Sequence, residues 1–237
     1  MSGTSTTADG RPKIVDKPLD STWFERFPPA QTDTILQYVA ASWCDLASRF
    51  PANHHSKIDE PDLTKSLAEH LDDANRRKSS GVGGRFHSER WIYKRLNNGK
   101  LKPFKRTDIE YHPPLRGSAT LVMEFKKLLG NSSGRRLYGV EGIGRFMRGE
   151  YCPHESHAVM CGLVSRTAWS SEQVALRQWI FRNHSRIGCI TNDSVALFRC
   201  PSVLAPSTAS FDTLHQRHSP PSTGPIWLGH LFFQLPP

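Results

Sequence analysis

Apolar residues recur at helical spacing in two stretches near the start of the chain. Between residues 35 and 50 they fall at steps of three and four, the period of one helix face. We expect Thr32 or Asp33 to cap this helix. A second helix is predicted to begin in the acidic stretch 59–62, where carboxylates and an early proline suit a helix N-terminus, and to end at the basic residues 76–78.

The second half of the chain alternates helix-like segments with apolar runs. The expected elements are a helix at 135–150, a strand at 158–164, a helix at 170–182 capped by a Ser170 to Gln173 pair, and strands at 194–198 and 226–235. The stretch 201–225 is rich in proline and serine and is expected to form a long surface loop. This order predicts an α/β fold in which helices flank a mixed β-sheet.

A length of 237 residues allows one substantial core with an appended segment. Residues 1–20 are polar and are predicted to form a disordered tail. Residues 21–56 are assigned to an N-terminal helical segment. The core is then expected to comprise residues 57–237.

Residues 107–127 are predicted to form two strands joined by a turn. From 120 to 127 apolar and charged residues alternate, which places Glu124 and Lys126 on one face of a strand. The run 107–111 alternates as well, and the prolines and glycine between the two runs are typical of a turn. We therefore expect an antiparallel hairpin.

The register of this hairpin brings two carboxylates together. With the turn centred near Leu115 and Arg116, Asp108 lies opposite residues 122–124. The carboxylates of Asp108 and Glu124 can then reach one cation. The alternative interpretation is an ordinary amphipathic hairpin whose charged face lies in solvent.

Asp108, followed by Glu124-Phe125-Lys126 at the end of an apolar strand, resembles the active-site signature of the PD-(D/E)xK nuclease superfamily. The resemblance covers the middle of the chain, and Thr107 stands where the motif has proline. It implies a restriction-endonuclease-like fold and a magnesium site made by Asp108, Glu124 and the carbonyl of Phe125. It also implies that Lys126 assists the attacking water.

Two further site residues follow from the same resemblance. Some members carry another acidic residue on the opening helix, for which Glu60 is the candidate and Glu89 a weaker alternative. The simpler interpretation of Glu60 is that it complements the helix dipole. The helix after the lysine strand contacts substrate in the superfamily, which suits Arg145, although pairing with Glu141 or exposure to solvent is the alternative.

Basic residues are concentrated around the proposed site. Residues 76–148 hold 18 Lys and Arg against 5 Asp and Glu, while the rest of the chain holds 13 against 17. The whole chain has a formal net charge of +9. This surplus predicts a surface that binds nucleic acid, although a solvated basic face remains the alternative. The residues expected to contact nucleic acid are Lys105, Arg106, Arg145 and Arg148.

Four side chains of zinc-ligand type, Cys152, His154, His157 and Cys161, lie close together in the sequence. Their spacing is not that of paired zinc knuckles, so loop histidines beside a core cysteine are the simpler interpretation, and zinc stays open. The five cysteines show no disulfide-scaffold spacing. Since the sequence also has no apolar leader and no run of ~20 apolar residues, we expect a cytoplasmic protein outside the membrane.

These features together predict a Mg²⁺-dependent endonuclease that hydrolyses phosphodiester bonds, in DNA rather than RNA, with an activated water. A protein partner that supplies specificity is expected by analogy with the family alone. The alternatives are a nucleic-acid-binding protein that keeps the nuclease fold without turnover, and an adaptor whose basic face binds another protein.

Overall fold

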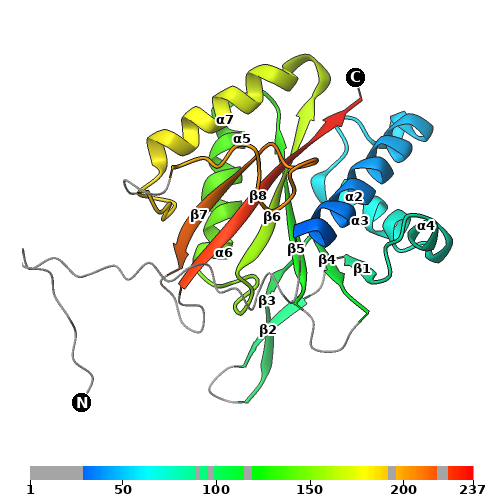
Figure 1. The fold of residues 1–237 in the computed structure, drawn as a ribbon, viewed down its shortest axis with the longest axis horizontal. Coiled ribbons are helices and arrows are strands. Elements are labelled where there is room, and N and C mark those ends of the chain that lie inside the picture. The colour runs from blue at the N-terminus through cyan, green and yellow to red at the C-terminus, as the bar shows by residue number, and fades with distance from the viewer. Residues whose placement is uncertain are drawn as a thin grey trace, which may run out of the picture.

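The computed structural model has a six-stranded β-sheet at its centre, with helices on both faces (Figure 1). The structure describes residues 29–88, 91–95, 99–114, 119–191, 196–217 and 224–236. Side chains are described for these residues except at 29, 91–95 and 101–105. The predicted disordered tail lies outside the described residues. The architecture belongs to the mixed α/β class that the sequence predicts.

The sheet has parallel strands at its centre and antiparallel strands at its edges. Its strands, in the order β1-β4-β5-β6-β8-β7, are β1 Arg85–Ser88, β4 Ile109–His112, β5 Leu121–Leu128, β6 His157–Ser165, β8 Gly224–Leu235 and β7 Phe211–Arg217. Strand β6 runs parallel to both β5 and β8, while the other pairs are antiparallel. The predicted hairpin is thus confirmed as the pair β4–β5, and its proposed turn at 115–116 lies outside the described residues.

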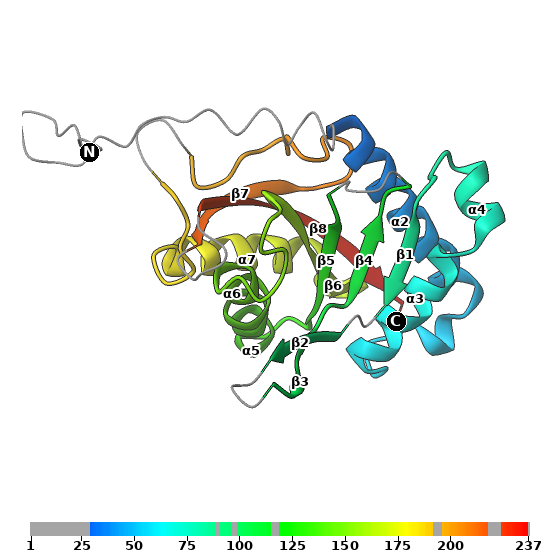
Figure 2. The ribbon, with the colours of Figure 1, turned by 90° about the horizontal axis from the view of Figure 1, so that it is seen from below.

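Helices pack on the two faces of the sheet in separate groups (Figure 2). The helices are α2 Pro29–Arg49, α3 Glu60–Leu71, α4 Ala74–Ser79, α5 Ser132–Arg136, the π-helix η2 Leu137–Ile143, α6 Gly144–Met147 and α7 Trp169–Asn183, with short 3₁₀ turns at Pro51–Asn53 and Arg166–Ala168. Helices α2 and α3 share one apolar cluster with the sheet, and η2, α6 and α7 share the other. None of the helices in the described residues is long and apolar enough to span a membrane.

The alternation in β5 divides the core into these two clusters. Met123 and Phe125 pack with α2 and α3, whereas Val122 packs with the helices on the other face. The charged positions are buried too, since Glu124 is 0% and Lys126 9% exposed. The alternative interpretation, a hairpin whose charged face lies in solvent, is therefore wrong, because helices cover both faces of this strand.

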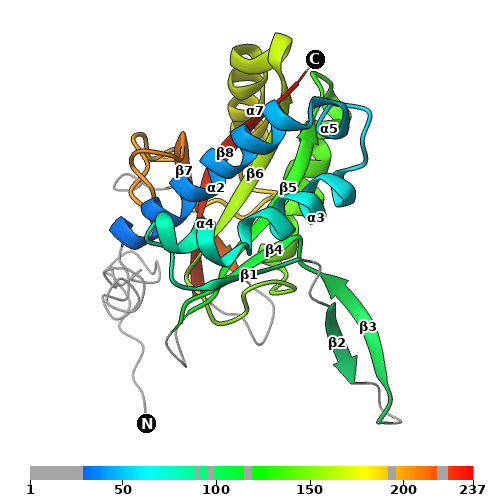
Figure 3. The same cartoon turned by 90° about the vertical axis from the view of Figure 1, so that its right-hand side faces the viewer.

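Strands β2, Trp91–Arg95, and β3, Leu101–Arg106, form a separate two-stranded sheet. Figure 3 shows this ribbon projecting away from the six-stranded sheet. The β3 strand ends immediately before the segment that leads into β4. The ribbon is therefore joined to the main sheet next to the β4–β5 hairpin.

The structure corrects the expected ends of the first two helices. Helix α2 begins at Pro29, so neither Thr32 nor Asp33 caps it. Instead, Asp33 Oδ1 accepts a hydrogen bond from Thr208 Oγ1 at 2.9 Å, a distant contact that local sequence does not reveal. Residues 76–78 belong to α4 rather than to the preceding helix.

Two expectations for the last third of the chain are wrong. The proline- and serine-rich stretch 201–225 is not all surface loop, because it contains β7. The described part of 194–198, residues 196–198, forms no strand, and helix α7 begins without a side-chain cap. Polar residues in β7 obscured its burial, since Thr213 and His215 are both fully buried and hydrogen-bonded.

The final predicted strand is confirmed as β8, which lies inside the sheet between β6 and β7. Its His230 is a core histidine, as expected. Its Nδ1 lies 2.9 Å from Tyr138 Oη and its Nε2 2.8 Å from Thr213 Oγ1, so both ring nitrogens have partners. Burial lowers the pKa of His230 well below its usual value, which keeps the ring neutral.

Small residues let the helical segment after β5 lie close to its neighbours. A Cβ atom added at Gly139 would lie 2.0 Å from Trp179 Cζ3, and one added at Gly142 would lie 2.4 Å from Met160 Cε. These distances are far shorter than van der Waals contact. The indole of Trp179 is rigid, whereas the Met160 side chain is flexible, so of these two positions Gly139 tolerates a side chain less.

We predict that Gly139→Ala lowers the free energy of unfolding by roughly 1–3 kcal/mol, because overpacking outweighs the better helix propensity of alanine. Urea denaturation measures the change. Gly83→Ala is the control, since its Cβ would meet only Pro114 Cγ, at an ordinary 3.6 Å. Equal denaturation midpoints for the two variants would contradict the prediction.

Candidate active site

Strand β5 continues beyond its pairing with β4, which begins opposite Met123. Two carboxylates take the place of the missing strand on this edge. Asp108 Oδ2 accepts a hydrogen bond from the backbone N–H of Phe125 at 2.8 Å, and Glu60 Oε2 accepts one from that of Lys127 at 2.8 Å. The open edge of β5 therefore positions both acids, one from the segment before β4 and one from the first turn of α3.

The ammonium group of Lys126 lies among four oxygen-bearing groups. Its Nζ is 2.7 Å from Glu60 Oε1, 2.8 Å from Glu124 Oε1, 2.5 Å from the Phe125 carbonyl and 3.9 Å from Asp108 Oδ2. The structure thus brings together the five residues that the sequence analysis assigned to the catalytic and metal sites. Because Glu60 contacts Lys126 directly, helix-dipole complementarity alone does not account for it.

Glu124 has the most perturbed environment of this group. Complete burial, followed by the nearby Asp108 carboxylate, raises the pKa of Glu124 to about 8, against the opposing effect of Lys126 and Arg145. Its Oε1 accepts hydrogen bonds, but its Oε2 has no hydrogen-bond partner among the described residues. A buried carboxylate oxygen without a partner is unfavourable in a folded protein and is an available ligand for a cation.

Lys126 remains protonated at neutral pH. Burial alone would favour the neutral amine, but the carboxylates of Glu124, Asp108 and Glu60 outweigh that effect and raise the pKa of Lys126. The side chain is therefore a hydrogen-bond donor and a fixed positive charge. It is not suited to accept a proton from water.

Arg145, from α6, is the second cation beside Glu124 and contacts the same carboxylate oxygen as Lys126. Its Nη1 donates to Glu124 Oε1 at 2.9 Å and to Tyr151 Oη at 2.6 Å, so it pairs with Glu124 rather than Glu141. Tyr151 in turn donates to the backbone carbonyl of Arg106 at 2.5 Å. Sequence analysis missed Tyr151, because nothing in its local pattern distinguishes it from an ordinary core tyrosine.

The other predicted nucleic-acid contacts are not members of the Lys126 group as far as the described side chains show. Arg148 pairs with Glu150, its Nε lying 2.7 Å from Glu150 Oε1, and is not part of the Lys126 group. Arg106 contributes its backbone carbonyl to Tyr151. The Lys105 side chain and all of Glu89 lie outside the described residues, so Glu60 is the extra carboxylate that the structure places here.

The side chain of Lys127 lies on the face of β5 opposite to that of Lys126 and stabilises the segment before α3. Its Nζ donates to the carbonyl of Ser56 at 2.9 Å and also to that of Ile58. These bonds hold the segment that leads into α3. Lys127 therefore helps to place Glu60 although its own side chain points away from Lys126.

The described residues contain no ready-made cluster of three or more His, Cys, Asp or Glu side chains that could hold a metal ion. The possible zinc ligands Cys152 and Cys161 belong to apolar clusters on opposite faces of the sheet. These two thiols therefore do not converge. This placement gives no support to a zinc site and fits the interpretation of Cys161 as a core cysteine.

The donors around Lys126 nevertheless fit a hard divalent cation chemically. They are carboxylate and carbonyl oxygens, the ligands that Mg²⁺ prefers, and Glu124 Oε2 still lacks a partner. The ammonium at the centre of the cluster already shows that these oxygens attract a positive charge. A divalent cation would share the cluster with this ammonium or replace some of its contacts.

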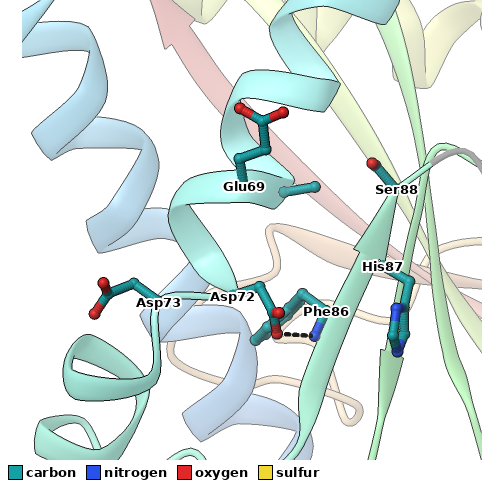
Figure 4. A pocket seen from close by; sticks show the side chains of 7 residues that line it. Glu69, Asp72, Asp73, Phe86, His87 and Ser88 are labelled. Atoms are coloured by element: carbon teal, nitrogen blue, oxygen red, sulfur yellow. Dashed lines mark hydrogen bonds between the residues drawn. The ribbon is translucent and has the colours of Figure 1, made fainter.

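A separate pocket between α3 and β1 contains none of these residues (Figure 4). Its lining includes the carboxylates of Glu69, Asp72 and Asp73. Asp72 already accepts hydrogen bonds from Arg85 and from the backbone N–H of Phe86. An acidic lining repels phosphate, so this pocket is not an alternative site for a polyanion.

Comparisons with known proteins leave the site to be interpreted from its own geometry. No family model matches the sequence, and no match was found among the curated proteins or the solved structures.

We predict that Glu124→Gln flattens the dependence of stability on pH. A carboxyl whose pKa rises from 4.5 to about 8 on folding stabilises the folded state fully below about pH 4.5, and this contribution is lost as the pH rises through 8. Relative to the variant, the parent should lose a few kcal/mol between about pH 5 and 8.

Urea denaturation at several pH values, without divalent cations, measures this difference. Glu69→Gln is the matched control, since Glu69 is an exposed carboxylate on α3. Its stability should follow that of the parent across the range. If Glu124→Gln and the parent change in parallel with pH, the inferred environment of Glu124 is wrong.

Proposed function

We propose that this protein is a metal-dependent nuclease of the PD-(D/E)xK type with a restriction-endonuclease-like core, which hydrolyses phosphodiester bonds in DNA rather than RNA. The observation that carries the proposal is the convergence of Asp108, Glu124 and Lys126 at the open edge of β5. The mixed sheet with helices on both faces is consistent with the fold that the sequence resemblance implies.

Magnesium is the proposed cofactor. Asp108, Glu124 and the carbonyl of Phe125 would hold the ion, with Glu60 as a further ligand. When bound, Mg²⁺ would neutralise charge on the scissile phosphate and lower the pKa of a water molecule. The unpartnered Oε2 of Glu124 supports this assignment, because it is the one buried oxygen of the cluster without a hydrogen bond among the described residues.

The roles of the other groups follow from their charges. Lys126 is protonated, so we assign to it the orientation of the attacking water or the stabilisation of negative charge on the phosphate oxygens, not the removal of a proton. Arg145 provides a second fixed positive charge 2.9 Å from Glu124. Either cation favours a phosphate that approaches this edge of the sheet.

The proposal of a nucleic-acid substrate rests on the distribution of charge. The segment 76–148, which contains β4, β5 and the helices α5 and α6, carries the whole basic surplus, since the rest of the chain has more acidic than basic residues. Polyanions bind such surfaces with release of counterions. We also propose that a protein partner supplies specificity.

One observation favours a second candidate function, that of a nucleic-acid-binding protein without turnover. Lys126 and Arg145 already occupy one oxygen of Glu124, and no preformed group of three metal ligands occurs in the described part of the chain. A cluster of this kind can persist as a purely structural ion-pair network.

Cleavage assays with and without Mg²⁺ separate these two functions. The substrates are plasmid, linear duplex DNA, single-stranded DNA and RNA, each tested with Mg²⁺ and with a chelator. A nuclease cuts at least one of them only with Mg²⁺. Salt-sensitive binding without any cleavage would leave the second function and exclude the first.

We predict that Lys126→Ala reduces single-turnover cleavage by about 10² or more, the effect of losing one preorganised charge in the transition state. Binding of DNA should stay within about tenfold of the parent, because the contact is made mainly during reaction. Lys126→Arg should restore little activity, since a planar guanidinium places its charge differently.

The control for this prediction is Lys65→Ala, which removes an exposed lysine from α3. Lys127→Ala is unsuitable, because that side chain holds the segment before Glu60. Circular dichroism should verify that each variant is folded. If Lys126→Ala cleaves as fast as Lys65→Ala, the catalytic role of Lys126 is wrong.

A further inference from the structure

The β2–β3 ribbon stands apart from the rest of the fold. It is a sheet of its own, and among the described elements each of its strands packs chiefly against the other. Figure 3 shows it extending from the body beside β4 and β5. An isolated two-stranded ribbon is only marginally stable in water, so a further interaction is needed to stabilise this one.

The sequence of the ribbon is strongly basic. Its two strands read WIYKR and LKPFKR, in which five of eleven residues are Lys or Arg and none is Asp or Glu. Their register places Lys94 directly opposite Lys102. Like charges at opposed positions destabilise a β-ribbon. A bound polyanion would turn this unfavourable pair into a favourable one.

The ribbon is poorly suited to pairing with a strand of another protein. Pro103 lies within β3 and cannot donate a backbone hydrogen bond; Lys102 precedes it directly and Lys105 follows two residues later. Proline and lysine are the residues that discourage strand addition at an exposed edge. The charge and the edge chemistry therefore favour nucleic acid over a protein strand.

The dimensions of the ribbon favour duplex DNA. Six residues of β3 span about 20 Å, enough to cross the major groove of B-form DNA, which is about 12 Å wide and admits a two-stranded ribbon. The major groove of A-form RNA is deep and narrow and does not admit one. Of the two duplexes, only DNA matches this element.

The base of the ribbon is tied to the candidate active site. Strand β3 ends at Arg106, two residues before Asp108. The backbone carbonyl of Arg106 accepts a hydrogen bond from Tyr151, whose hydroxyl also accepts one from Arg145. A duplex held by the ribbon would consequently lie beside the Lys126 cluster.

We infer that the β2–β3 ribbon docks duplex DNA through its major groove and so places a phosphodiester bond at the open edge of β5. The placement of a phosphodiester bond for cleavage rests on the proposed nuclease function. Docking of DNA on the ribbon requires no cleavage. Binding is therefore measured without divalent cations, which separates the two proposals.

Lys94→Glu is the most informative variant. It places an acid opposite Lys102, a pair that stabilises the ribbon, while it removes two units of positive charge from the docking surface. We expect its thermal unfolding midpoint to equal or exceed that of the parent. Its affinity for a duplex DNA of about 20 base pairs should fall at least about tenfold at ~100 mM salt.

The salt dependence gives a second measure. The slope of log affinity against log salt concentration should become shallower by about one to two, since each lost phosphate contact removes close to one unit. Lys78→Glu is the matched control, an exposed lysine on α4, which lies away from the ribbon (Figure 2). It should bind duplex DNA as the parent does.

The inference is overturned if Lys94→Glu binds duplex DNA with the affinity and salt slope of Lys78→Glu. It is also overturned if the parent does not bind duplex DNA, or binds single-stranded DNA or duplex RNA of the same sequence more tightly. Docking through the ribbon without Mg²⁺-dependent cleavage would reject the nuclease function alone. Cleavage that is insensitive to Lys94→Glu, with unchanged binding, would reject the ribbon alone.

Discussion

The complete burial of the Glu124 carboxylate is the constraint on which the arrangement around β5 depends. A carboxylate removed from water is unfavourable unless cations and donors face it, and Lys126 and Arg145 are the two cations that do so. Each cation also has another partner: Lys126 pairs with Glu60, and Arg145 donates a hydrogen bond to Tyr151. Displacement of one member therefore disturbs the others. This coupling joins the end of β5 to the first turn of α3 and to the base of the β2–β3 ribbon.

The open edge of β5 decides where the remaining acids lie. Since β4 begins opposite Met123, the backbone N–H groups of Phe125 and Lys127 would face no strand, and carboxylates of Asp108 and Glu60 accept from them instead. Each carboxylate has one oxygen committed to the backbone, which fixes the direction of the side chain. The same hydrogen bonds that complete the sheet thus preorganise an oxygen-rich cluster. In this protein, the geometry of a proposed catalytic site and the stability of a strand end have one physical cause.

The proposed function distributes tasks between this rigid cluster and the projecting ribbon. Glu124 and Lys126, at the centre of the cluster, are buried, which strengthens the electrostatic interactions between them. Each strand of the ribbon packs chiefly against the other, and the register places Lys94 opposite Lys102. An element of this kind is suited to contact with a polyanion. The hydrogen bond from Tyr151 to Arg106 is the physical link between the two parts.

The sequence by itself determined the elements whose signal is local. The period-two alternation in β5 and the turn residues before it predict the β4–β5 hairpin and the approach of Asp108 to Glu124 and Lys126, because side-chain direction in a strand depends only on position. Only the tertiary structure decided that Glu60 joins this cluster, that Tyr151 bridges to the ribbon, and that polar β7 is a buried strand rather than a loop. These features depend on partners far apart in the chain, and a buried polar side chain that is hydrogen-bonded by such partners gives no apolar signal in its own segment.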